Sequence, residues 1–112
     1  MNSTKSVSSQ VEQQALAAVE SHPLHKDAIA WPYCVSDVFE ESKAFADRMR
    51  LPEEDKARIQ AALSNVENVI LVSYWTCAQK PEPLSGGGKY YAFLVHPQSF
   101  TVLHSGVSTW RS

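Results

Sequence analysis

The stretch that decides the fold is Val69-Ile70-Leu71-Val72-Ser73-Tyr74-Trp75, a run of β-branched, aliphatic and aromatic residues. Such residues favour strands, and a run that is apolar on both alternating faces is typical of a central strand. A second strand is predicted from Lys89 to His96, because its large apolar side chains alternate between two faces. One face would carry Tyr90, Ala92 and Leu94, and the other Tyr91, Phe93 and Val95.

The sequence after these strands predicts a hairpin. Pro97-Gln98-Ser99 has the composition of a tight turn, and residues 100–104 would return antiparallel. Gly106 is expected to end this strand, leaving residues 107–112 as a tail that contains Trp110. Residues 78–88, AQKPEPLSGGG, are expected to form a long loop between the first two strands.

Helical spacing dominates the chain before Val69. Ser8 or Ser9 can cap a first helix, which Pro23 would end. A second helix is expected to start at Ser36 or Asp37, with Asp37 and Glu40 as a capping pair, and a third at Pro52. Their apolar stripes are Val11, Ala15, Ala18 and Val19; then Val38, Phe39, Phe45, Ala46 and Met49; then Ile59, Ala62, Leu63 and Val66.

Together these patterns predict an α+β fold with two to three N-terminal helices packed on a small C-terminal antiparallel sheet. Residues 1–112 would form a single domain, with residues 1–8 as a flexible arm. Residues 22–35 predict a connection, although Ile29, Trp31 and Tyr33 also alternate as in an edge strand, and both possibilities stay open. The expected core includes Phe45, Ile59, Leu63, Leu71 and Phe93.

Composition narrows the class of function. An apolar fraction of 44% is ordinary for a globular protein, and a net charge of −2 with no basic stripe argues against nucleic-acid binding. Residues 36–67 carry five basic and eight acidic side chains, a net charge of −3. No apolar run has the length of a membrane span or a signal peptide, so we expect a cytoplasmic protein. Cys34 and Cys77 would then be reduced, and we expect both to be buried.

The residues that could support catalysis or metal binding do not form a recognisable set. His22 and His25 have the spacing of metal ligands, but Pro23 interrupts the helix and no third ligand is near, so we expect exposed histidines. Cys77 has no feature that would activate its thiol towards His96 or His104. Gly86-Gly87-Gly88 is followed by a strand, whereas a phosphate-binding loop needs a helix. We therefore predict no enzyme activity, no cofactor and no metal.

Aromatic residues near the long loop are the candidate binding site. If helices cover one face of the sheet, the other face is either exposed as an interface or buried because the sheet curls. Both possibilities stay open. The candidate partner-binding residues are Tyr74, Trp75, Tyr90, Tyr91 and Trp110, with Gly86 and Gly87 in the loop.

A resemblance comes from residues 69–108. A strand ends in Tyr74-Trp75, a long loop leads to Leu84-Ser85-Gly86-Gly87, and two strands follow, one over residues 90–95 and one ending at Gly106. This pattern resembles small bacterial immunity proteins of the nuclear-transport-factor or cystatin-like type, which neutralise a secreted toxin. It departs from the pattern at the turn, residues 96–100, and the Gln-x-Val-x-Gly loop of cystatin inhibitors is absent.

The resemblance implies a protein that inhibits a bacterial toxin or effector by occluding its active site. Two alternatives remain. One is a cone-shaped α+β domain that binds a small ligand or acts on it in a pocket between sheet and helices. The other is a homodimer formed through the sheet, with a structural or regulatory role.

Overall fold

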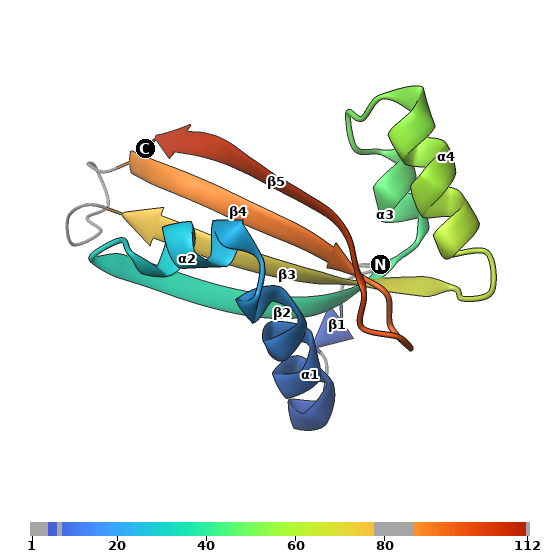
Figure 1. Ribbon diagram of the computed structural model, residues 1–112, viewed down its shortest axis with the longest axis horizontal. Helices are drawn as coiled ribbons and strands as arrows, with labels where there is room; N and C mark the ends of the chain where they lie inside the picture. Colours follow the sequence, from blue (N-terminus) through green and yellow to red (C-terminus); the bar gives the residue numbers. More distant parts are fainter. Residues whose placement is uncertain (1–4, 7, 78–86, 112) are drawn as a thin grey trace.

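The computed structural model describes residues 5–6, 8–77 and 87–111, and the side chains of residues 8–77 and 87–110. Within these residues a five-stranded antiparallel sheet runs through the molecule, with every strand beside its neighbour in sequence (Figure 1). The strands are β1 (Lys5–Ser6), β2 (Tyr33–Ser42), β3 (Asn68–Cys77), β4 (Gly87–Val95) and β5 (Val102–Arg111).

The four helices are α1 (Ser9–Glu20), α2 (Pro23–Ile29), α3 (Ala44–Asp47) and α4 (Glu53–Ala62), counted within the described residues. The Ser8 hydroxyl accepts the Val11 N–H and caps α1, as predicted. Residues 23–29 form a helix instead of the predicted connection, because Pro23 takes the first helical position and His22 Nδ1 accepts the Leu24 N–H at 3.1 Å.

The helices pack on both faces of the sheet. On the first face, α1 and α2 bury Ala15, Val19 and Ala28 against a row of strand residues that includes Val72 and Phe93. On the second face, Ala46 of α3 and Ile59 of α4 pack on Val69, Leu71 and Leu94 at one end of the sheet only. Figure 1 shows α3 and α4 at that end, apart from α1 and α2.

The α+β class, with helices packed on an antiparallel sheet, is confirmed. The helix predicted from Ser36 or Asp37 is wrong over most of its length: residues 33–42 form β2, and helix is limited to Ala44–Asp47. The reason is tertiary. All ten residues of β2 pair with β3, which is buried on both faces and takes β2 as its neighbour on the side away from β4.

The last strand is longer than predicted. Gly106 lies in the middle of β5, opposite Ala92, and Trp110 belongs to the strand rather than to a tail. The strand continues because β4 begins early, at Gly87, and gives β5 a partner along its whole length. The turn at Pro97-Gln98-Ser99 is confirmed; the His96 N–H donates to the Thr101 carbonyl at 2.9 Å and closes it.

The ends of the predicted segments are resolved in part. Lys5 and Ser6 pair with Glu40 and Phe39 as β1, while the remainder of the predicted arm up to residue 7 lies outside the described residues. Of the predicted loop, residues 78–86 also lie outside them. The open question at residues 29–33 has a divided answer: Ile29 ends α2, Trp31 lies in a turn, and Tyr33 starts β2.

Four of the five predicted core residues are buried, namely Ile59, Leu63, Leu71 and Phe93. The fifth, Phe45, is half-buried against the cluster formed by α3, α4 and the second sheet face. The helical and strand periods therefore identified the core positions of α4, β3 and β4 correctly.

Candidate functional site

The second sheet face is covered by the described helices at one end only. Strand pairing places Val35, Trp75, Tyr90 and Ser108 side by side across this face. Trp75 lies four residues along β3 from Leu71, which α3 and α4 cover, a separation of about 13 Å at about 3.3 Å per residue. We call the half of this face around Trp75 the open sheet face; it carries Tyr33, Val35, Trp75, Tyr90 and Trp110.

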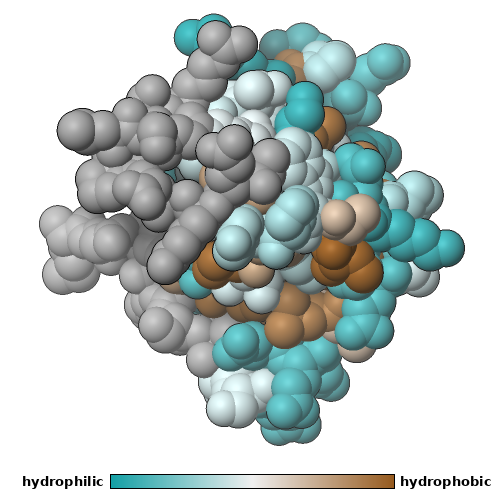
Figure 2. Space-filling model, turned by 90° about the vertical axis from the view of Figure 1, so that its left-hand side faces the viewer, coloured by the Kyte–Doolittle hydropathy of each residue, from teal (hydrophilic) through white to brown (hydrophobic). Residues whose placement is uncertain are grey.

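Three aromatic rings form the centre of the open sheet face. The Trp75 and Tyr90 centroids are 4.4 Å apart, and those of Trp75 and Trp110 are 6.0 Å apart with the rings nearly perpendicular. These are favourable geometries for aromatic pairs. Trp75 is nevertheless 45% exposed, and the neighbouring Val35 and Tyr33 are 60% and 43% exposed. Figure 2 views this end of the molecule and shows residues of high hydropathy, in brown, at its surface; tryptophan and tyrosine are pale on that scale, so the three rings do not stand out by colour.

Trp110 is held in place by the backbone of β3. Its indole Nε1–H donates to the Thr76 carbonyl at 2.9 Å. The Thr76 hydroxyl donates to the Lys89 carbonyl and accepts the Lys89 N–H, both at 3.0 Å. Gly88 makes this close approach possible, because a Cβ there would lie 1.9 Å from the Thr76 carbonyl oxygen. The ring cluster is therefore pre-ordered by four residues that leave Trp75 exposed.

The hydroxyl of Tyr90 lies towards a polar part of the face. Burial raises the pKa of Tyr90, the nearby Asp37 and Glu41 carboxylates raise it further, and a hydrogen bond with Ser73 opposes them. The phenol is thus neutral at physiological pH and available as a hydrogen-bond donor as well as an apolar surface.

A groove lies between this ring cluster and the segment that joins α3 to α4. Its floor consists of small residues, Ala92 and Gly106, which face each other across β4 and β5. Met49, Arg50 and Leu51 line it from one side and Tyr90 from another. His104 also lines it, and burial lowers the pKa of that imidazole. The groove combines an apolar floor with one exposed guanidinium, Arg50.

The predicted site residues divide between the two faces. Trp75, Tyr90 and Trp110 lie together on the open sheet face, and Gly87 lies beside them at the start of β4. Gly86 lies outside the described residues. Tyr74 and Tyr91 are buried on the opposite face, below α2.

Structural contacts account for both buried tyrosines. The Tyr91 hydroxyl donates to Asp27 at 2.6 Å and accepts the Trp31 indole N–H at 3.2 Å, which attaches α2 to the sheet. The Tyr74 ring packs against Phe93 and His25, with centroids 6.0 and 5.6 Å apart. In this arrangement neither ring offers surface to a partner.

Sequence reasoning missed Tyr33 and Val35 as surface residues. The alternation at Ile29, Trp31 and Tyr33 was a signal for a strand here, but the expected helix from Ser36 hid its continuation. Once β2 is recognised, Val35 is placed opposite Trp75 and Tyr33 opposite Cys77 by register alone.

Two histidines expected to be exposed pack instead against core aromatics. The His22 ring lies 5.3 Å from that of Phe93, and its Nε2 is 3.1 Å from the Ser105 hydroxyl. Because Nδ1 accepts the Leu24 N–H, the neutral ring carries its proton on Nε2 and donates to Ser105. A base must accept the serine proton, so this arrangement leaves Ser105 unactivated.

The cysteines also differ from expectation. Cys77 is buried as predicted, but Cys34 is exposed. Partial burial of the Cys34 thiol raises its pKa. Leu71, Leu94 and His104 lie in one cross-strand row. Cys77 lies six residues along β3 from Leu71 and therefore from this row, so about 20 Å separates Cys77 from His104. Among the described residues no group of three His, Cys, Asp or Glu side chains could hold a metal ion.

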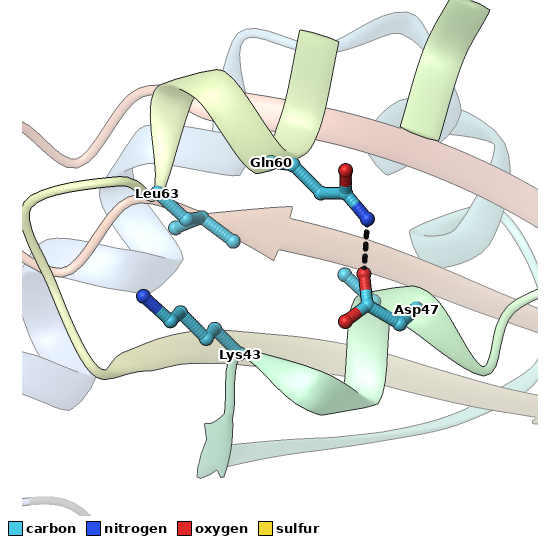
Figure 3. Close-up of a pocket in the computed structure, with 5 residues that line it drawn as sticks. Lys43, Asp47, Gln60 and Leu63 are labelled. Carbon is cyan, nitrogen blue, oxygen red and sulfur yellow. Dashed lines mark hydrogen bonds between the residues drawn. The ribbon is translucent and has the colours of Figure 1, made fainter. Parts of the chain in front are cut away.

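A smaller pocket of about 130 Å³ lies between α3 and α4 (Figure 3). Gln60 of α4 donates to Asp47 of α3 at 2.6 Å across it, with Lys43 and Leu63 on other sides. This hydrogen bond joins the two helices and gives the pocket a structural role.

No helix in the described part of the chain is long and apolar enough to cross a membrane. Comparison with models of protein families, with curated proteins and with solved structures finds no match to this chain.

Proposed function

We propose that this protein is a non-enzymatic binding protein that recognises another protein through its open sheet face. The observation that supports this proposal is the exposure of Trp75, Val35 and Tyr33 on a sheet face that the described helices leave uncovered. Contiguous exposed apolar surface of this kind is typical of interaction sites, and its energetic centre is most often Trp or Tyr.

The order of the ring cluster also supports binding. The indole hydrogen bond of Trp110 and the close contact of Tyr90 restrict Trp75 before any partner arrives. A restricted aromatic side chain loses less conformational entropy on binding than a mobile one. Trp75 is therefore the residue at which we expect the largest loss of affinity on truncation.

The partner we propose is a bacterial toxin or effector, which the protein would inhibit as an immunity protein by occluding the active site. Support for this finer proposal is the resemblance of residues 69–108 to immunity proteins. Three segments of that pattern, Tyr74-Trp75, residues 90–95 and Leu103–Gly106, lie on the adjacent strands β3, β4 and β5, so the side chains of these segments that point to the open sheet face, Trp75 and Tyr90 among them, would form one continuous surface.

The test is affinity capture from the native host, with the full chain as bait and Trp75→Ala as the variant. The matched control is Val107→Ala, since Val107 is 49% exposed in the same sheet but on the opposite face. We expect a captured protein that is toxic when expressed alone and harmless with this chain. Trp75→Ala should weaken its binding about thirtyfold, equivalent to about 2 kcal/mol, with a nearly unchanged melting temperature.

Two results would contradict the proposal. Equal binding by wild type and Trp75→Ala would place the interface elsewhere, and a captured partner without toxicity would remove the immunity role while leaving protein binding. A failure to capture any partner, with harmless expression of each neighbouring reading frame, would refute both.

The groove supports one rival, a small-ligand site. Its floor at Ala92 and Gly106 and its cation Arg50 suit an apolar molecule with an anionic group. Arg50→Ala separates the two: it would abolish binding of such a ligand, whereas protein binding centred on Trp75 would persist.

A further inference from the structure

The two outer edges of the sheet differ. The outer edge of β2 is paired with β1 only at Phe39 and Glu40. The rest of that edge has no described partner strand, but β2 carries the acidic residues Asp37 and Glu41, whereas no acidic residue lies in β5. At the other side, β5 pairs with β4 from Val102 to Arg111, and no further described strand pairs with it (Figure 1). The outward N–H and C=O groups of β5 therefore have no partner strand within the described residues.

Natural sheets protect such edges with lysine, proline, inward-facing charge or a bulge. In β5 the protective features occur only at its beginning, where a bulge faces Leu94 and Val95 and Arg58 Nη1 donates to the Leu103 carbonyl at 2.8 Å. The next seven residues, His104 to Trp110, contain no lysine, proline or acidic side chain. Most of β5 is thus a long, regular edge that can accept another strand.

We infer that β5 pairs antiparallel with β5 of a second copy of this chain, joining two sheets into one. The edge is self-complementary: pairing centred on Val107 places the two Arg111 residues at opposite ends and sets no like charges against each other. Ser105, Gly106 and Ser108 are small, so the two strands can approach closely. Val107, 49% exposed in one copy, then lies beside its equivalent.

This inference goes beyond the proposed function and has a geometric consequence for it. A two-fold axis perpendicular to the sheet keeps both open sheet faces on the same side. It also reverses β5, so Trp110 of one copy lies opposite His104 of the other. The dimer would present one continuous surface that contains two ring clusters.

The test is the molar mass of the full chain by light scattering from low to high micromolar concentration. We expect a dimer for wild type and a monomer for Val107→Lys, because two ammonium groups would meet across the axis. The control is Val35→Lys, which adds the same charge at an exposed valine near the other edge of the sheet and should remain dimeric. Melting temperatures establish that each variant is folded.

Charge reversal supplies a second measurement. Val107→Glu alone should also be monomeric, and an equimolar mixture of Val107→Lys and Val107→Glu should form a heterodimer. A monomeric wild type at every concentration overturns the inference. A dimer that Val35→Lys dissociates and Val107→Lys does not would overturn it as well, since the contact would then lie on the open sheet face or at the β2 edge.

Discussion

The substitution Gly88→Ala tests the geometry that holds the ring cluster. An added Cβ would lie 1.9 Å from the Thr76 carbonyl oxygen and 2.8 Å from its carbon. Both atoms belong to the backbone, so no side-chain rotation can relieve the clash. Either β3 or β4 must move by more than about 1 Å to restore an ordinary contact.

The cost follows from the contacts at Thr76. Overpacking of a tight site costs about 1–3 kcal/mol. A shift of the Thr76 backbone also weakens its hydrogen bond from Trp110 and the two that its side chain makes with Lys89, each worth about 1 kcal/mol. We expect a loss of about 2–4 kcal/mol in the free energy of unfolding, or roughly 10 °C in melting temperature.

Gly106→Ala is the matched control, because it makes the same change in the neighbouring strand. There the nearest atom to the new Cβ is His104 Nε2 at 3.6 Å, an ordinary contact. We expect the free energy of unfolding to change by no more than about 1 kcal/mol, because alanine also lowers the backbone entropy of the unfolded chain and so offsets part of any loss. Urea unfolding measures both variants. Equal effects at the two glycines would refute the close approach of Thr76 to Gly88.

Two further predictions concern the core. Ile59→Ala should lower the free energy of unfolding by about 2–5 kcal/mol, whereas Ile29→Ala, at a residue that is 55% exposed, should change it by less than about half a kilocalorie in urea denaturation. Burial, with smaller contributions from Cys34 and Glu20, raises the pKa of Tyr74 to about 12 from an ordinary value of 10.0. The folded state therefore retains this proton longer than the unfolded state, so stability should fall as the pH rises from 10 towards 12. The stability of the Tyr74→Phe variant should fall less over that range. Equal slopes of stability against pH for wild type and variant would contradict the raised pKa.

Local patterns predicted α1, α4, β3, β4 and the turn after β4. In each of these the period of apolar residues and the terminal signal agree, as at Ser8 before α1 and Pro52 before α4. The expected helix over residues 36–49 failed because its local signal, Asp37 followed by Glu40, competes with a non-local one. A strand that is apolar on both faces needs a neighbour on each side, and β4 supplies only one.

The boundary of β5 shows the same limitation. Glycine inside a strand weakens it, so Gly106 is a reasonable end point for any single-sequence argument. In the sheet the cost is offset, since Gly106 pairs with Ala92 and the strand continues beyond it alongside Gly88, Lys89 and Tyr90. Length was set by the partner strand rather than by β5 itself.

The division of the aromatic residues between the two faces explains what the sequence could establish about the candidate site. Neighbouring residues of a strand point to opposite faces, so Tyr74 and Trp75 must be separated, as must Tyr90 and Tyr91. The register then pairs Trp75 with Tyr90 and Tyr74 with Tyr91.

Which pair is exposed depends on where the helices pack. The apolar side of α1, with Ala15 and Val19, covers the face of Tyr74 and Tyr91, while α3 and α4 stop short of Trp75. A one-residue change of register between β3 and β4 would bring Trp75 beside Tyr91 and move one of the two rings off the open sheet face. The bonds from Thr76 to Lys89 and from Trp110 to Thr76 fix that register, so the contacts that order the cluster also determine which aromatic residues form it.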